Sequence, residues 1–509
     1  MPTAMPTDQT EPFPVDAAVA ELEVLRGRFD WAQAWRISRA WHDTDPYDFY
    51  AAWNALHDST QLGDWTRHEF LQTVVAEGIA HTGDASLVGE LALATPRFTP
   101  PLLLAGAQRH VRRLLGDRAT AAPLIARGHH YPGHRRLRIG YIGGDFYYQA
   151  TSYLLAGVLE HHDHEQFELV CFDFSRDDTA EAGLTDASRD QRKAFRARLE
   201  GCFDRVVSLH ALNAAECARQ VREAEIDVAV YISRPVDERF AMLAHRPAPV
   251  QVAYLFYPGT TGAPFIDYLV ADAIVVPTEA EANYSERILR LPNCYQPHDH
   301  RRAEPAAVTR ADFNLPPDAL VLANFNQCYK TTPEVFALWC ELLRGQPDAV
   351  LWLRGGPPEA NANLQAQAAL RGVAAHRIVF GAPVSVHLHL GRLRHCVDLV
   401  LDTFPYGGHT LTSDALWAGV PVVTRMGDTF ASRVAASLLN AVGLPELVTH
   451  SAADYLACAR ALCADASRRQ RLRDHLARVR GSCPLFDTAR YTRDLEAAYL
   501  RIAPGPSST

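Results

Sequence analysis

Short apolar segments alternate with helix-like segments from residue 137 onward, and this alternation limits the fold more than any other feature. Each apolar segment is rich in Val, Ile, Leu and Phe and is bounded by turn-forming residues, which is typical of strands covered on both faces. Strands of this kind alternate with helices in doubly wound parallel sheets. The predicted strands are 137–142, 167–174, 206–209, 226–232, 250–256, 320–325, 349–353, 377–380, 397–402 and 420–424.

Two turn-rich stretches divide the chain into three predicted domains. Residues 15–115 give only helical patterns, and the stretch 128–136 separates them from the first strand. A second Pro-rich and charged stretch, 296–317, separates the two groups of strands. We therefore predict a helical domain at 1–134 followed by two Rossmann-like α/β domains at 135–300 and 301–509. Sheets of this type bind ligands at the carboxyl ends of their strands, here in the cleft between the two domains.

Composition excludes several classes of partner. The net charge of −9 argues against general nucleic-acid binding and against an anionic-membrane mode. Neither a secretory leader nor an apolar run long enough to span a membrane is recognisable in the sequence. The ten cysteines are scattered without the spacing of a zinc site, so we expect a reduced, cytoplasmic protein with no metal.

One lysine stands out because the chain has only two, Lys193 and Lys330, among 50 basic residues. Lys330 follows a predicted buried strand, and a helix start with Thr332 as N-cap and Pro333 at its first position comes next. An ammonium group beside a helix N-terminus is suitably placed to hold a phosphate. The alternative is a lysine in a surface loop with no role.

The segment 397–419 carries a second phosphate-type signal. A predicted strand is followed by Gly407 and Gly408, a turn that lets backbone approach a ligand closely, and then by His409 and Thr410. Thr412 or Ser413 is expected to cap the next helix, with Asp414 in its first turn and Gly419 at its end. Free amides at such a helix start suit a diphosphate, and Asp414 could accept ribose hydroxyls or simply favour the helix dipole. The sequence has neither a Walker motif nor GxGxxG after its first strand.

These segments resemble glycosyltransferase family 41, in particular the catalytic regions of bacterial, SPINDLY-like protein O-GlcNAc transferases. The most specific stretches are YPGTTGA at 257–263, NFNQCYK at 324–330 and DALWAG at 414–419. Further similar stretches, in order, are 137–141, 145–146, 151–152, 246–251, 267–268, 284–286, 350–353, 409–410, 429–437 and 485–492. The resemblance implies a GT-B fold, in which the C-terminal lobe holds most of a nucleotide-sugar and the last helix crosses back to the first lobe.

The resemblance also implies which residues form the site. Gln327 and Lys330 match the family's diphosphate contacts, and Gly408, His409, Thr410 and Asp414 match its phosphate and ribose contacts. The implied reaction is inverting transfer without a metal, in which Lys330 and helix amides stabilise the departing UDP.

Several positions depart from the family pattern. Gln149, predicted as a catalytic residue together with Lys330, stands where the family has a histidine. A glutamine there can orient an acceptor or a phosphate, but it cannot take up a proton near neutral pH, and other candidate bases nearby in sequence are Asp145, Tyr147, Tyr148 and Tyr153. Thr151, close to Gln149, is assigned to the sugar and acceptor site. Leu411 replaces a threonine, and Leu390 aligns with the aromatic residue expected against uracil. Phe256 replaces a small residue before the sugar and acceptor loop of Pro258, Gly259 and Thr260, where its ring could fill the space of an N-acetyl group. The family's tetratricopeptide array is not recognisable before residue 130.

The predicted function is a protein glycosyltransferase that moves a sugar from a UDP-sugar, with UDP-GlcNAc as first choice, to a protein or peptide acceptor. A UDP-glucose-dependent protein N-glucosyltransferase is an alternative, and GDP-fucose is a third possible donor. The departures at Gln149, Phe256 and Leu411 also fit a catalytically lapsed nucleotide-binding scaffold.

Overall fold

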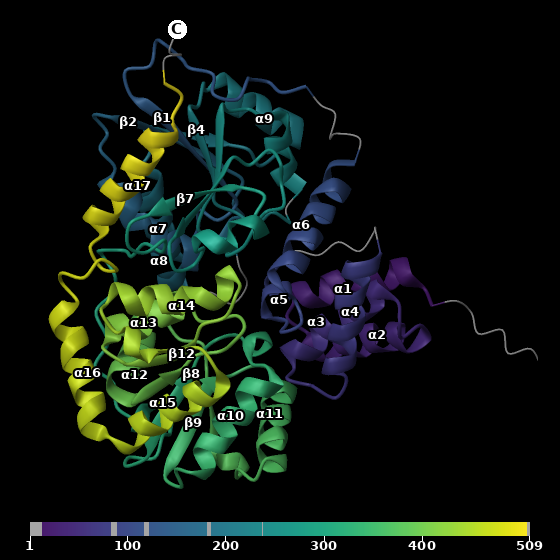
Figure 1. The fold of residues 1–509 in the computed structure, drawn as a ribbon, viewed down its shortest axis with the longest axis vertical. Helices are drawn as coiled ribbons and strands as arrows, with labels where there is room; N and C mark the ends of the chain where they lie inside the picture. The colour runs from purple at the N-terminus through teal and green to yellow at the C-terminus, as the bar shows by residue number, and fades with distance from the viewer. Residues whose placement is uncertain (1–12, 83–88, 117–121, 181–184, 237, 506–509) are drawn as a thin grey trace, which may run out of the picture.

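The computed structural model describes residues 13–82, 89–116, 122–180, 185–236 and 238–505. Two parallel sheets with helices on their faces lie one above the other, and a bundle of helices packs beside their junction (Figure 1). The predicted fold class, two Rossmann-like lobes behind a helical region, is confirmed. Among the described residues, no helix has the length and apolar character needed to cross a bilayer.

The N-terminal lobe is built on a seven-stranded sheet in the order β3-β2-β1-β4-β5-β6-β7. β1 pairs in parallel with both β2 and β4, so the strand order reverses between β1 and β4. Its elements are β1 (Leu137–Gly143), α7 (Ala150–His161), β2 (Phe167–Asp173), α8 (Asp186–Glu200), β3 (Arg205–Ser208), α9 (Ala214–Glu223), β4 (Val228–Tyr231), β5 (Val250–Ala253), β6 (Tyr268–Asp272) and β7 (Arg287–Leu291).

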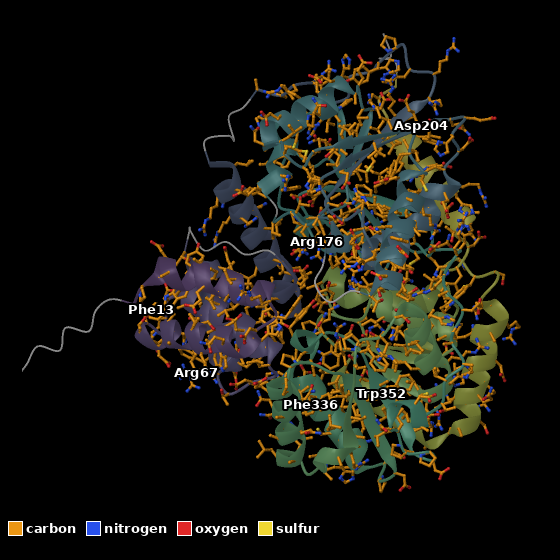
Figure 2. All side chains as sticks on the ribbon, turned by 180° about the vertical axis from the view of Figure 1, so that it is seen from behind. Phe13, Arg67, Arg176, Asp204, Phe336 and Trp352 are labelled. Atoms are coloured by element: carbon orange, nitrogen blue, oxygen red, sulfur yellow. The ribbon has the colours of Figure 1, made fainter. Side chains whose placement is uncertain are left out.

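The C-terminal lobe repeats this plan with six strands in the order β10-β9-β8-β11-β12-β13, and its strand order reverses between β8 and β11. Trp339 and Trp352 are fully buried in its core, where Figure 2 shows Trp352 among packed side chains. Its elements are β8 (Leu320–Asn324), η6 (Cys328–Lys330), α10 (Pro333–Arg344), β9 (Ala349–Arg354), α11 (Pro358–Leu370), β10 (Ile378–Gly381), α12 (Val386–Cys396), β11 (Leu399–Leu401), α13 (Thr410–Ala418), β12 (Val422–Arg425), α14 (Phe430–Ala441), β13 (Val448–Thr449), α15 (Ala452–Ala464), α16 (Ala466–Val479) and α17 (Thr488–Ile502).

The helical region packs on the C-terminal lobe as well as on itself. The ring of Trp65 lies 5.4 Å from that of Phe336 on α10, and the side-chain amide of Asn363 on α11 donates to the carbonyl of Leu62. These contacts fix the region at the edge of the cleft. Its helices are α1 (Val15–Gly27), α2 (Trp31–Thr44), α3 (Phe49–Gln61), α4 (His68–His81), α5 (Glu90–Ala94) and α6 (Pro100–Leu115).

The last helix, α17, returns to the N-terminal lobe and packs on α7 and β7, as the resemblance implies (Figure 1). Glu496 on α17 lies 3.0 Å from Nδ1 of the buried His162, whose Nε2 lies 2.8 Å from the hydroxyl of Tyr141. Burial lowers the pKa of His162 although Glu496 opposes that shift, so the ring is neutral and donates from Nδ1 to the carboxylate. This buried network joins the last helix to the first strand of the N-terminal lobe.

The structure corrects several predicted elements. The strands β6, β7 and β13 were not predicted, and β5 ends at Ala253 rather than at residue 256. Thr332 caps α10 with Pro333 at its start, as predicted. The predicted caps of α13 are wrong: the helix already begins at Thr410, and both Thr412 and Ser413 are buried within it.

Candidate functional site

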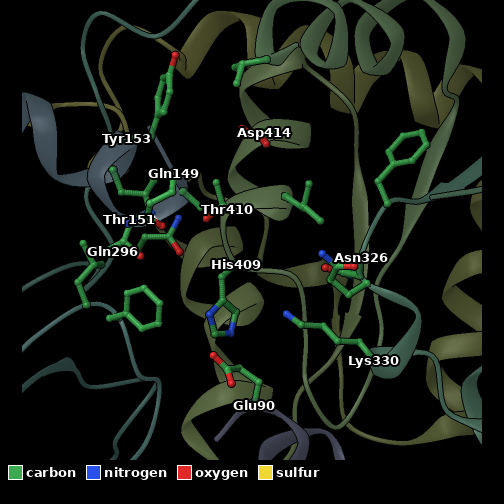
Figure 3. Close-up of a pocket in the computed structure, with 18 of the residues that line it drawn as sticks. Glu90, Gln149, Thr151, Tyr153, Gln296, Asn326, Lys330, His409, Thr410 and Asp414 are labelled. Carbon is green, nitrogen blue, oxygen red and sulfur yellow. Dashed lines mark hydrogen bonds between the residues drawn. The ribbon is translucent and has the colours of Figure 1, made fainter. Parts of the chain in front are cut away.

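A cavity of about 480 Å³ lies between the two lobes (Figure 3). The loops that follow β1, β8 and β11 line it, and these are the strands at which the order of each sheet reverses. Ligands bind at such switch points in open α/β sheets because loops from neighbouring strands diverge there. The lobes and the helical region each contribute side chains, since Glu90 of α5 also lines the cavity.

Lys330 points into this cavity from the short helix η6 (Figure 3). Its ammonium group donates to the carbonyl of Gly407 over 3.1 Å and lies 3.4 Å from the ring centre of Tyr406. Burial lowers the pKa of Lys330 from 10.5 to about 7, and the negative charges of Asp402 and Glu90 oppose this shift. An anion placed in the cavity would favour the charged ammonium form.

The turn after β11 is organised around the carboxylate of Asp402, which is 1% exposed. Its oxygens accept hydrogen bonds from the backbone of Gly408 over 2.6 Å and from the hydroxyl of Thr424 over 2.7 Å. Burial raises the pKa of Asp402 to about 6, against the effect of these hydrogen bonds and of Lys330. A Cβ at Gly407 would lie 2.9 Å from this carboxylate. Glycine at position 407 thus allows the backbone of the turn to lie against the Asp402 carboxylate. The backbone at Gly408, predicted to contact the ligand, already donates its amide hydrogen to that carboxylate.

The N-terminus of α13 faces the cavity through His409, Thr410 and Leu411. No side chain within the described residues caps this helix end, so its first amides are available to an anion. Burial and the charge of Lys330 lower the pKa of His409 to about 3, which makes the imidazole neutral. The Nε2 of His409 lies 3.2 Å from the carbonyl of Ala431, so that nitrogen carries the hydrogen.

Asp414 also lines the cavity, but not as predicted. It lies in the second turn of α13 rather than the first, and it forms an ion pair with the buried guanidinium of Arg302. Nε2 of His389 lies 3.5 Å from its other oxygen. The stretch 296–317, predicted only as a connection between domains, therefore supplies a counter-ion to the site.

Gln149 and Thr151 lie across the cleft, on the N-terminal lobe (Figure 3). Gln149 is the N-cap of α7: its side-chain oxygen accepts from the Thr151 amide over 3.0 Å. Its amide nitrogen donates to the carbonyl of Asp145 over 3.1 Å. Both polar ends of Gln149 are thus bonded to backbone.

Phe256 lines the same cavity, and the guanidinium of Arg234 lies 5.4 Å from its ring centre. The rest of the predicted sugar loop does not: Pro258, Gly259 and Thr260 line a separate small pocket with α14 and the helical region. There Thr260 donates to the buried carboxylate of Glu286 over 2.7 Å. This hydrogen bond, within the N-terminal lobe, holds the loop at the small pocket, and Phe256 is the one of these four residues that lines the cleft.

Leu390 was predicted to lie against the base, but its side chain is fully buried within α12. Val386, one turn earlier on the same helix, lines the cavity instead. The backbone at Ala306 packs closely on this part of α12: a Cβ at Gly391 would lie 2.5 Å from the carbonyl oxygen of Ala306, and the Ala306 amide donates to the carbonyl of His387 over 3.2 Å.

Gln327 and Lys330 are brought together with His409, Thr410 and Asp414, while the sequence reasoning missed several other lining residues. Arg354 ends β9, and the rule that ligands bind at carboxyl ends of strands could have identified it. Asn326 closely follows β8, in the loop that also carries Gln327 and Lys330, so the same rule could have identified it. No sequence signal identifies Glu90, Gln296, Asp299 and Arg302, because they come from the connection between lobes or from the helical region. The missed polar residues are Glu90, Gln296, Asp299, Arg302, Asn326 and Arg354.

One group of side chains within the described residues has the composition of a metal site: Glu160, Asp299 and His300. Arg198 bonds both carboxylates, with distances of 2.6 Å to Glu160 and 2.7 Å to Asp299. A guanidinium thus already neutralises this cluster, and its residues do not carry a metal assignment.

Comparison with known proteins identifies the family to which these two lobes belong. The model of glycosyl transferase family 41 matches residues 123–306 and 303–495. A probable UDP-N-acetylglucosamine–peptide N-acetylglucosaminyltransferase of Arabidopsis thaliana, SEC, is 34% identical over 73% of this chain and 37% of its own length. The SPINDLY protein of Oryza sativa subsp. japonica is 31% identical over 72% of this chain and 38% of its own length. The chain thus matches less than half of either relative.

A solved structure covers almost the whole chain. The O-GlcNAc transferase of Thermobaculum terrenum, determined as a point mutant, superposes with a TM-score of 0.76 at 28% identity. The match covers 97% of this chain and 92% of that one, so it includes the helical region as well as both lobes.

Proposed function

Because the chain belongs to glycosyltransferase family 41, we propose that it transfers a sugar from a UDP-sugar to a side chain of a protein or peptide. UDP-GlcNAc is the first choice of donor, since the similar proteins are named for that substrate. The observation that carries the proposal is the shared cavity of Lys330 and the open N-terminus of α13. A cation and free amides on one cavity wall suit the diphosphate of such a donor.

The proposed chemistry is a single, inverting displacement that needs no metal. As the bond from the anomeric carbon to the β-phosphate breaks, negative charge develops on UDP, and the Lys330 ammonium and the α13 amides stabilise it. The same charge raises the proton affinity of Lys330, so the lysine is fully charged when the donor is bound. The anomeric configuration of the product and the rate in excess chelator test these two details. The ten free cysteines support a cytoplasmic site of action.

UDP-glucose remains a second candidate donor because the ring of Phe256 lines the cavity. An aromatic ring in this position reduces the space for an N-acetyl group. A lapsed nucleotide-binding scaffold is the remaining alternative, since Gln149 acts as a helix cap and cannot serve as a base.

Calorimetric binding of UDP, UDP-GlcNAc, UDP-glucose and GDP to the full chain tests the site. We expect the uridine nucleotides to bind and Lys330→Ala to weaken them about 10- to 100-fold, the effect of one charge-assisted contact. Lys193→Ala is the matched control, because Lys193 is an exposed residue of α8. Failure of all four ligands to bind the wild-type protein would refute the nucleotide site. Binding without transfer to any member of a serine, threonine and asparagine peptide array would favour the scaffold.

A further inference from the structure

The helical region places a carboxylate in the cleft. Glu90 begins α5, a short helix whose Leu93 and Ala94 are buried against Tyr406 and Ala431 of the C-terminal lobe. The amide of the preceding Gly89 donates over 3.3 Å to the hydroxyl of Tyr257 on the N-terminal lobe. Because α5 is attached to both lobes, the backbone that carries Glu90 is fixed relative to the cleft.

The side chain of Glu90 enters the cavity at the end opposite Asp414, with His409 and Lys330 between them (Figure 3). Its oxygen lies 3.4 Å from the guanidinium of Arg234, whose other contact in the cleft is the ring of Phe256. If ribose lies near Asp414 and the diphosphate at Lys330, the sugar extends toward Glu90 and Phe256. The charged or titratable groups that face Glu90 are Arg234, Tyr257, Tyr329, Lys330 and Tyr406.

The other proton acceptors that line the cavity are occupied. Arg198 binds both oxygens of Asp299, and Arg302 pairs with Asp414. His409 resists protonation because of burial and of the adjacent Lys330. Glu90, by contrast, has only one ion pair among the described residues, with an Arg234 side chain that is 50% exposed.

A second groove leads from the helical region to the same carboxylate. Its volume is about 430 Å³, and Trp31, Trp53 and His57 are among the residues that line it. Glu90, Gln327 and Tyr329 line both this groove and the cleft, so the two spaces meet at these residues. An acceptor peptide laid along the aromatic side chains would present its hydroxyl to the sugar beside Glu90.

We propose that Glu90 is the catalytic base that takes the proton of a serine or threonine hydroxyl during transfer, an inference that rests on the proposed function. The hydroxyl oxygen forms the bond to the anomeric carbon as the bond from that carbon to the β-phosphate oxygen breaks. The electron pair of the broken bond leaves with UDP, and the hydroxyl proton moves to the Glu90 carboxylate and then to solvent. The base absent at position 149 is thereby supplied by another domain.

The test measures UDP release from UDP-GlcNAc and from UDP-glucose by the full chain, with an array of serine- and threonine-containing peptides as acceptors. We expect Glu90→Gln to lower kcat about 100-fold or more, the usual contribution of a general base, while the donor Kd changes less than twofold. The fall in rate of the wild-type protein at acid pH should disappear in this variant. Glu90→Asp should restore part of the rate, and formate should partly rescue Glu90→Ala. Glu21→Gln, an exposed glutamate on α1, is the matched control.

The outcomes separate this inference from the function on which it rests. Wild-type transfer with a Glu90→Gln rate within threefold, or with an unchanged pH profile, overturns the role of Glu90 and leaves the proposed function intact. Equal loss of donor binding and rate shows a purely structural role and also overturns it. A wild-type protein that binds donors but glycosylates no peptide overturns both.

Discussion

The buried charge of Lys330 predicts a variant that is more stable than the wild-type protein but binds nucleotide more weakly. Lys330 is 8% exposed, and its pKa falls from 10.5 to about 7 on folding. That difference means that burying the charged ammonium on folding costs roughly 5 kcal/mol more than burying the neutral amine. In Lys330→Met the lost hydrogen bond to Gly407 offsets about 1 kcal/mol of this gain. The variant should therefore unfold at a higher temperature near neutral pH.

The dependence on pH gives the sharper test, and its sign follows from proton binding. Above pH 10.5 the lysine is neutral in both states, so it costs nothing. Between pH 10.5 and about 7 the unfolded chain binds a proton that the folded chain does not. As the pH is lowered through this range, the free energy of unfolding of the wild-type protein therefore falls by about 1.4 kcal/mol per pH unit. Below pH 7 both states are protonated and the cost is constant. The advantage of Lys330→Met should thus be largest below pH 7 and shrink toward pH 10.

Differential scanning calorimetry of the two proteins at pH 6.5, 8 and 9.5 measures this advantage, with Lys193→Met as the control for loss of an exposed lysine. At equal concentration, UDP should raise the unfolding temperature of the wild-type protein more than that of Lys330→Met. An advantage of equal size at all three pH values would refute the buried-charge argument. So would a Lys330→Met protein that is less stable throughout.

Three further predictions concern the rest of the site and its support. Gln149→Ala should lower the free energy of unfolding by about 1 kcal/mol through loss of the α7 cap, with donor affinity within twofold; a large loss of affinity with unchanged stability would contradict the capping role. Phe256→Gly should raise the rate with UDP-GlcNAc relative to UDP-glucose by about 10-fold or more, and identical ratios in both proteins would dispose of the steric argument. UDP binding at pH 8 should be coupled to uptake of a proton, because the diphosphate restores the charge of Lys330, whose pKa in the free protein is about 7. Calorimetry in buffers of different ionisation enthalpy measures the number of protons taken up, and a value of zero would exclude a titrating lysine.

The fold could be predicted largely because its signals are local. Strands covered on both faces have continuous apolar runs, and the start of α10 has both a threonine cap and a proline. The position of Lys330 beside that helix follows from the same few residues. The missed strands β6, β7 and β13 lie among loops and short 3₁₀ turns, where periodicity gives no signal.

The parts of the site that could not be predicted depend on contacts between distant segments. The pairing of Asp414 with Arg302 requires the fold to bring the connection between lobes over α13. The exchange of Leu390 for Val386 is an error of one helical turn, caused by the backbone that covers the second turn of α12. Glu90 reaches the cleft only because the helical region docks on both lobes, and nothing in its own neighbourhood in the sequence indicates that.

The energetics of Lys330 bear on whether the site is active or lapsed. Only two of the 50 basic residues are lysine, and one of them is buried where its charge destabilises the free protein. A scaffold that no longer bound phosphate would gain stability from almost any apolar replacement at this position. Binding of a diphosphate removes the cost, because the ligand supplies the missing counter-charge. A locally unfavourable lysine at a strand switch point, beside an open helix N-terminus, is therefore better explained by a site that still binds its nucleotide.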